Sequence, residues 1–143
     1  MPKIERSIFI NAPVDKVFSY VHEPNNMLEY WPSMLEVKNV KALPNGGYEY
    51  DWVYNMAGIH INGHADWVEY VENERLVNKN ESSIPSTFIW SYKPEGDGTR
   101  LDLSVEYTIP GAVLGKLAEP FIRKLNENQA DTVIANLKAK LET

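Results

Sequence analysis

The apolar residues of this chain change their periodicity once, and the change limits the folds that the chain can adopt. Between residues 34 and 109, apolar and polar residues alternate along several runs, as in β-strands with one buried face. The alternation is clearest in Tyr48–Met56, Ile59–Val71 and Leu101–Ile109. From Gly111 to Leu141 the apolar residues follow a helical period instead, which predicts one long helix. The chain is therefore expected to form a sheet that is covered by a C-terminal helix.

The N-terminal residues are expected to add one strand and two short helices. Lys3–Ile10 has the pattern of a strand. A short helix follows, with an apolar face made of Val14, Val17, Phe18 and Val21. Pro24 breaks this helix. A second amphipathic piece then carries Met27, Leu28, Tyr30 and Trp31.

The predicted order is a strand, two short helices, about six antiparallel strands and the long helix, in one α+β domain over residues 1–143. An antiparallel sheet of about seven strands curls, and a single helix along its concave side cannot fill the space at both ends. We expect the two short helices to close one end of the gap between sheet and long helix. Pro120 lies near the start of the long helix and is expected to kink it or to separate a lead-in turn.

The composition excludes several classes of function. Fourteen Lys and Arg against twenty Asp and Glu give a net charge of −6, which argues against nucleic acid or an anionic membrane surface as the main partner. The absence of cysteine excludes disulfides, thiolate nucleophiles and Cys-ligated metals. The N-terminus does not resemble a signal peptide, and no segment approaches the ~20 apolar residues of a membrane helix. We expect a soluble, cytoplasmic protein without integral membrane association.

Two stretches carry a resemblance to a known superfamily: INAPVDKVFSYVHEPNNMLEYWP (residues 10–32) and YTIPGAVLGKLAEPF (residues 107–121). With the order of elements, they resemble the START-related, birch-pollen-allergen-like (SRPBCC) superfamily, and most closely its polyketide cyclase/dehydrase and lipid-transport branch. The resemblance spans the whole chain. It implies a helix-grip fold, in which a curved antiparallel sheet wraps around the C-terminal helix and leaves a deep, mostly apolar cavity. The superfamily includes carriers, cyclases and ubiquinone-binding proteins, so the fold alone does not define one activity.

The residues themselves also indicate such a cavity, because one face of the predicted sheet is rich in amphipathic aromatic side chains. The candidate ligand-binding residues on this face are Tyr50, Trp52, Tyr54, Met56, Phe88, Trp90, Tyr92 and Tyr107. The short helices add Phe18 and Trp31, and the long helix adds Leu117, Phe121, Leu125 and Gln129. The alternative is that these side chains simply fill the core. Each of them taken singly fits that alternative, whereas the set as a whole favours a cavity.

Gln129 is the most informative polar residue of the long helix. It falls in the same four-residue row as Leu117, Phe121 and Leu125, so it interrupts an apolar face with an amide. A buried amide needs hydrogen-bond partners, and Tyr54, Tyr107 or a ligand could provide them. The apolar stripe drifts around this helix, so a position at its solvated edge is the alternative.

No catalytic or metal-binding constellation is recognisable. His60, His64 and Asp66 lie on one predicted strand, but residues four apart in a strand are separated by ~13 Å and cannot share one ion without another strand. These side chains are expected to face solvent, and His22, at the end of a helix, is expected to be structural. No nucleophile elbow or phosphate-binding glycine loop is present in the sequence. The sequence therefore predicts no cofactor and no metal.

The function that fits these observations best is the binding, with or without transport, of a small hydrophobic molecule such as a lipid, a quinone or a polyketide-like compound. Two alternatives stay open: a cyclase or dehydratase that uses the same cavity, and a non-catalytic interaction module of the co-chaperone type. A carrier needs an apolar cavity with few ionisable groups, an enzyme needs a buried acid or base, and an interaction module needs an exposed apolar patch. The sequence leaves the oligomeric state open.

Overall fold

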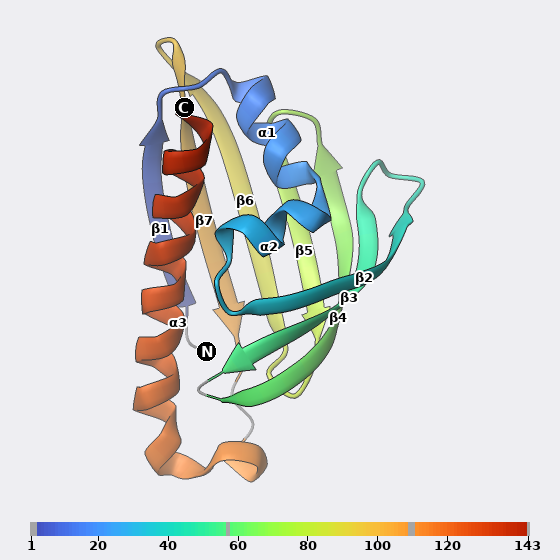
Figure 1. Ribbon diagram of the computed structural model, residues 1–143, viewed down its shortest axis with the longest axis vertical. Coiled ribbons are helices and arrows are strands. Elements are labelled where there is room, and N and C mark those ends of the chain that lie inside the picture. The colour runs from blue at the N-terminus through green and yellow to red at the C-terminus, as the bar shows by residue number, and fades with distance from the viewer. Residues whose placement is uncertain (1–2, 57, 109–110, 143) are drawn as a thin grey trace.

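The computed structural model describes residues 3–56, 58–108 and 111–142, except for the side chains of residues 59, 111–119 and 121. The elements follow the predicted order (Figure 1). They are β1 (Lys3–Ile10), α1 (Val14–His22), the 3₁₀ turn η1 (Pro24–Asn26), α2 (Met27–Tyr30), β2 (Met34–Ala42), β3 (Tyr48–Met56), β4 (Ile59–Val71), β5 (Arg75–Glu81), β6 (Ser86–Glu95), β7 (Gly98–Tyr107) and α3 (Gly111–Leu141).

The strands form one antiparallel sheet in the order β1-β7-β6-β5-β4-β3-β2. Each strand from β2 to β7 pairs with its neighbour in sequence, and β1 pairs with β7. Figure 1 shows that the sheet curves and that α1, α2 and α3 all lie on its concave side. The predicted α+β helix-grip architecture is therefore confirmed.

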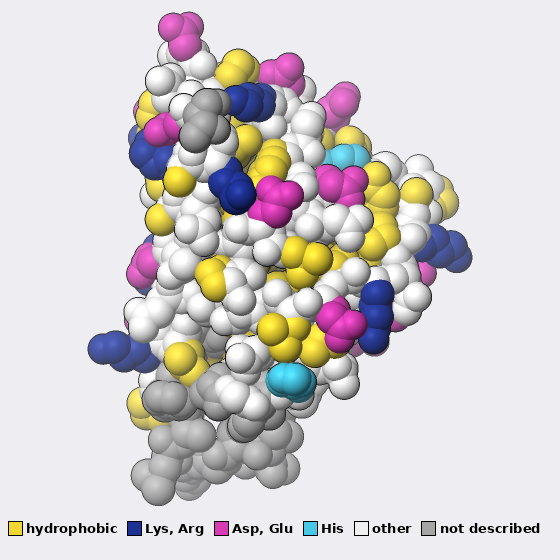
Figure 2. Space-filling model, viewed as in Figure 1, with side chains coloured by type: hydrophobic (Ala, Val, Ile, Leu, Met, Phe, Trp, Pro, Cys, Tyr) yellow, Lys and Arg dark blue, Asp and Glu magenta, His cyan; other side chains and the backbone are white. Residues whose placement is uncertain are grey.

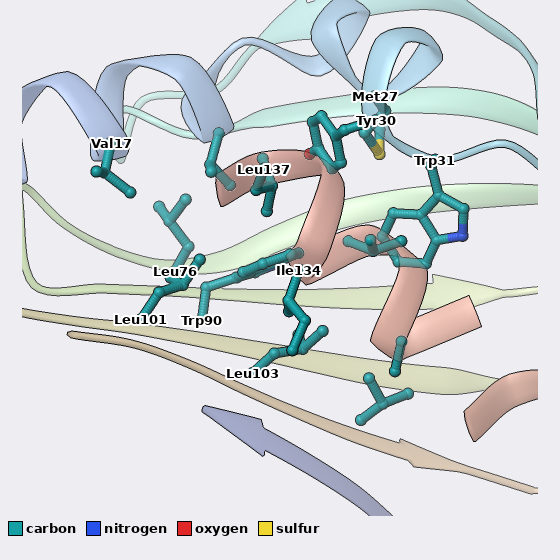
Figure 3. Close-up of a cluster of buried hydrophobic side chains, with 14 of the residues drawn as sticks. Val17, Met27, Tyr30, Trp31, Leu76, Trp90, Leu101, Leu103, Ile134 and Leu137 are labelled. Carbon is teal, nitrogen blue, oxygen red and sulfur yellow. The ribbon is translucent and has the colours of Figure 1, made fainter. Parts of the chain in front are cut away.

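α3 packs along the concave face beside β1 (Figure 1). Its side chains Val133 and Leu137 are completely buried. Figure 3 shows Ile134 and Leu137 in the same apolar cluster as Leu103 of β7 and Tyr30 of α2. The helix therefore joins the sheet and the short helices into one core.

Polar contacts attach the C-terminal half of α3 to its neighbours. Lys138 Nζ donates a hydrogen bond to the carbonyl of Phe9 at 2.8 Å, and Asn136 Nδ2 donates to the carbonyl of Tyr30 at 3.0 Å. Near its other end α3 changes direction, in the region that contains Pro120, as the sequence predicted (Figure 1). The C-terminal half of α3 is therefore the part of the helix that these hydrogen bonds attach to β1 and α2.

α1 covers one end of the concave face. Val17, Phe18 and Val21 are buried beneath it, which is the apolar face that the helical spacing predicted. His22, its last residue, places Nε2 at 2.9 Å from the carbonyl oxygen of Gly46, so that Nε2–H donates to the turn between β2 and β3. This role for His22 is structural, because the bond fixes the end of α1 to the sheet. Among the described helices, none is both long enough and apolar enough to span a bilayer.

Candidate functional site

A cavity of about 120 Å³ lies between the concave face of the sheet, α2 and the middle of α3. The sheet contributes side chains from β3, β4, β5, β6 and β7, because residues at alternate positions of each strand point to the concave side. Met27, Tyr30 and the following Trp31 close the end beneath α2. The two short helices thus form part of the wall, in agreement with the closing role expected for them.

Most of the candidate ligand-binding residues come together in this wall. The structure places Trp31, Tyr50, Trp52, Tyr54, Met56, Phe88, Trp90, Tyr107 and Gln129 around the cavity. All four tryptophans of the chain line it, namely these three and Trp67. Three of the four methionines do so as well: Met27, Met34 and Met56. The cavity is therefore aromatic and thioether-rich rather than purely aliphatic.

Other candidates lie elsewhere. Phe18 and Tyr92 pack edge to face beneath α1, with ring centroids 5.0 Å apart, and belong to the core at the end of the sheet that α1 covers. Leu125 is half-buried on α3 and does not line the cavity. Leu117 and Phe121 lie in α3, but their side chains are outside the described part of the chain.

Two polar residues of the wall, Asn78 and Asn80, were not among the candidates. Both lie on β5, are only 8% exposed, and follow Leu76 at alternate positions on the concave face. The signal was present in the sequence, since Leu76, Asn78 and Asn80 share the inward phase of a strand.

The two asparagines form a hydrogen-bonded chain with Trp52. Trp52 Nε1 donates to Asn80 Oδ1 at 3.0 Å, and Asn80 Nδ2 donates to Asn78 Oδ1 at 2.7 Å. The three residues come from β3 and β5, so the chain crosses β4 between them. It gives the cavity a fixed polar strip in which the indole and amide groups satisfy one another.

Three other polar atoms of the wall are buried and have no hydrogen-bond partner among the described residues: Trp31 Nε1, Tyr107 Oη and Gln129 Oε1. The hydrogen bond that was suggested between Gln129 and Tyr54 or Tyr107 is thus not formed through the glutamine oxygen. Gln129 lies in the cavity wall, and its side chain is half-buried. The wall therefore presents hydrogen-bonding capacity that the protein itself does not use.

Three tyrosines of the wall, Tyr30, Tyr50 and Tyr54, keep their protons at neutral pH because burial disfavours the phenolate. Burial raises the pKa of Tyr30 and of Tyr50. Burial also raises the pKa of Tyr54, and the side chains of Ser33 and Trp31 near its hydroxyl act in the opposite direction, although the indole N–H of Trp31 does not reach hydrogen-bonding geometry. A phenol whose pKa is raised keeps its proton and can donate and accept hydrogen bonds, but it is a poor general base.

The histidines that suggested a metal site are on the outer face of the sheet. His64 Nδ1 lies 2.7 Å from Asp51 Oδ1 on the neighbouring strand, and this contact raises the pKa of His64. His60 is exposed. Among the residues that the structure describes, no group of three His, Asp or Glu side chains is arranged to hold a metal ion.

The outer surface carries a few exposed apolar side chains. Figure 2 shows hydrophobic groups over the region of α2 and β2, among scattered charges of both signs. Leu28 on α2 is 45% exposed, and Leu35 on β2 is 43% exposed. Neither lines the cavity.

Comparisons with known proteins agree with this architecture. A family model described as polyketide cyclase / dehydrase and lipid transport matches residues 1–142. A protein from Thermus thermophilus is 20% identical and superposes with a TM-score of 0.86 over 98% of this chain and 97% of that one. A START superfamily protein from Mycobacterium smegmatis, 14% identical, covers 98% and 97% of the two chains with a TM-score of 0.82.

A solved structure of a named enzyme also has this fold. The Zhui aromatase/cyclase from Streptomyces is 12% identical and has a TM-score of 0.86 over 99% of this chain and 93% of that one. At such identities the similarity shows the fold alone. No curated protein matched the sequence.

Proposed function

Because this chain belongs to the polyketide cyclase/dehydrase and lipid transport family, we propose that it binds a small, mostly apolar molecule in the cavity between the sheet and α3. The observation that supports this proposal is the cavity wall, in which four tryptophans and three methionines surround a space that the described side chains leave unfilled. Rigid aromatic surfaces and adaptable thioethers are the groups that apolar ligand pockets commonly use.

The size of the cavity restricts the ligand. A dry apolar cavity of about 150 Å³ in another protein accommodates benzene, so a cavity of about 120 Å³ holds about one bare ring, and a ring with substituents also requires the wall to yield. A lipid or a multi-ring compound would fit only if part of the wall moved. α2 is the part best suited to move, because it is a single helical turn that closes the cavity with Met27 and Tyr30.

The polar groups of the described wall favour binding over catalysis. They are amides, hydroxyls and indole N–H groups, for example Asn78, Ser86 and Trp31. A cyclase or dehydratase moves protons and needs a group that changes its protonation near neutral pH. The hydroxyls of Tyr30, Tyr50 and Tyr54, with pKa values raised by burial, hold their protons too firmly for that role.

Methionine-methyl NMR tests the proposal, since Met27, Met34 and Met56 surround the cavity. Protein labelled with ¹³C at the methionine methyl groups is titrated with 4-isopropyltoluene, a neutral one-ring hydrocarbon. We expect all three methyl resonances to shift in a saturable way. If none of the three shifts at the solubility limit of the probe, the cavity does not bind apolar molecules and the proposal fails. Native mass spectrometry of freshly purified protein would identify a ligand that is carried over from the cell.

A further inference from the structure

We infer that the ligand is an uncharged, oxygen-bearing ring compound, such as a phenol or an aryl ketone, which is oriented by Trp31, Tyr107 and Gln129. This inference rests on the proposed function and specifies its ligand class. It starts from the buried polar atoms that have no partner. In the described part of the chain these are Trp31 Nε1, Tyr92 Oη, Ser104 Oγ, Tyr107 Oη and Gln129 Oε1.

Three of these five atoms belong to residues that line the same cavity, and the residues come from three separate parts of the chain. Trp31 follows α2 and is 8% exposed, Tyr107 ends β7 and is 2% exposed, and Gln129 lies on α3. Because water reaches none of the three atoms, each loses hydrogen bonding that it would have in the unfolded chain. A ligand that supplied the missing partners would recover this loss.

The chemistry of the three groups defines the complementary ligand. The indole N–H of Trp31 can only donate, so it requires an acceptor such as a carbonyl or phenol oxygen. The hydroxyl of Tyr107 can donate or accept, and the amide of Gln129 can present its oxygen or its NH₂. A ligand with one acceptor and one hydroxyl satisfies this set, whereas a hydrocarbon of the same shape leaves all three atoms unpaired.

The same wall disfavours an anionic ligand. The polar groups that the structure describes around the cavity are all uncharged. A carboxylate that enters such a site gives up its hydration without gaining a cation in return. The cavity is therefore suited to a neutral phenol or ketone and not to a fatty acid or a phosphorylated compound.

The Trp52–Asn80–Asn78 chain already provides partners for Trp52 Nε1, Asn80 Oδ1, Asn80 Nδ2 and Asn78 Oδ1. Trp52 and Asn80 bond to each other, and Asn80 bonds to Asn78. The polar atoms that form these two bonds already have a protein partner. We therefore expect them to shape the wall and not to orient the ligand. The unpaired atoms of Trp31, Tyr107 and Gln129 are the ones that gain most from a ligand.

The test compares three one-ring probes by calorimetric titration. 4-Hydroxyacetophenone carries a hydroxyl and a ketone, 4-isopropyltoluene is its hydrocarbon counterpart of the same shape, and 4-hydroxybenzoate carries a carboxylate. The variants are Tyr107→Phe and Gln129→Leu. Each removes an unpaired polar group and keeps the size of the side chain, so the fold is expected to survive. The matched control is Tyr92→Phe, because Tyr92 Oη is also buried without a partner but lies outside the cavity.

We expect Tyr107→Phe and Gln129→Leu each to weaken 4-hydroxyacetophenone about five- to fiftyfold, the range for one unmade buried hydrogen bond, and to leave 4-isopropyltoluene within about twofold. Tyr92→Phe should change neither. Unchanged affinity of both variants for 4-hydroxyacetophenone would overturn the inference while the proposed function stood. So would an equal loss for the two neutral probes, or binding of 4-hydroxybenzoate as tight as that of the ketone. Failure of every probe to bind the wild-type protein would overturn the proposed function itself, and the inference with it.

Discussion

The indole of Trp52 reaches over a neighbouring strand to hydrogen-bond Asn80, with Nε1 at 3.0 Å from Oδ1. Trp52 is on β3 and Asn80 is on β5, so β4 lies between them. The residue of β4 that pairs with Trp52 is Gly63. A Cβ atom at Gly63 would lie only 2.2 Å from the Trp52 ring. The missing side chain of Gly63 therefore lets the indole lie flat across β4 and complete the polar strip of the cavity.

Gly63→Ala should therefore displace the Trp52 ring. We expect the substitution to reduce the free energy of unfolding by about 1–3 kcal/mol, as for other overpacked sites, and to shift the Trp52 fluorescence. Urea denaturation of Gly63→Ala in the wild-type and Trp52→Leu backgrounds tests the mechanism. The cost should nearly vanish when the large ring is absent. An equal cost in both backgrounds would mean that Gly63 is needed for a backbone reason instead.

Buried tyrosine hydroxyls with and without a partner should differ in their contribution to stability. Tyr50 Oη accepts a hydrogen bond from Trp67 Nε1 at 3.4 Å, whereas Tyr92 Oη is buried with no partner in the described part of the chain. Tyr50→Phe should lower the free energy of unfolding by about 1 kcal/mol, because it leaves the indole N–H unpaired. Tyr92→Phe should be neutral or slightly stabilising, because it removes a buried hydroxyl that gains nothing in the fold. Equal losses in thermal denaturation would contradict this difference.

The contact between His64 and Asp51 should be visible in a pH titration. A side-chain hydrogen bond from Asn39 and the contact with His64 lower the pKa of Asp51, and the contact with Asp51 raises the pKa of His64. The protonated imidazole therefore stabilises the fold below the ordinary pKa of histidine, and this contribution is lost as the pH rises through the raised pKa. The aspartate contributes above its ordinary pKa and loses its effect as the pH falls through the lowered value. The contact thus acts between the two shifted pKa values.

NMR titration of the His64 ring measures this contact directly. We expect a titration midpoint above that of an unperturbed histidine, and a lower midpoint in Asp51→Asn. Because the side chains of His64 and Asp51 are 42% and 40% exposed, solvent screens the contact and the accompanying change in stability should be small. A midpoint that is the same in the wild-type protein and Asp51→Asn would show that the two side chains do not interact in solution.

The fold could be predicted well from the sequence because the spacing of apolar residues within one strand or helix shows which of its faces is buried. Alternation placed Tyr50, Trp90 and Tyr107 on the concave face, and the helical row placed Gln129 on the inner side of α3. Alternation does not show where along a strand the cavity ends. Tyr92 was therefore assigned to the cavity although α1 covers that end of β6 with Phe18.

The polar parts of the wall were harder to predict, because they depend on contacts between strands that are not neighbours. The buried position of Asn80 is explained by its hydrogen bond with Trp52, whose ring passes over Gly63. Predicting this bond requires the register of three strands. A glycine inside a long strand was the available signal for such a close approach. The partners of Gln129 could not be derived, since no described protein group bonds to its side-chain oxygen.

A substitution that fills the cavity tests most directly whether the ligand binds between the sheet and α3. Ala130 lies on α3, is 5% exposed and lines the cavity, whereas Ala135 is on the exposed side of the same helix. Ala130→Phe should occupy the space that a ligand would use, and Ala135→Phe is the matched control. The measurement is the affinity for 4-hydroxyacetophenone by calorimetry, with circular dichroism to verify the fold of each variant. We expect at least a tenfold loss for folded Ala130→Phe and no change for Ala135→Phe; an unchanged affinity in folded Ala130→Phe would show that the ligand binds outside this cavity.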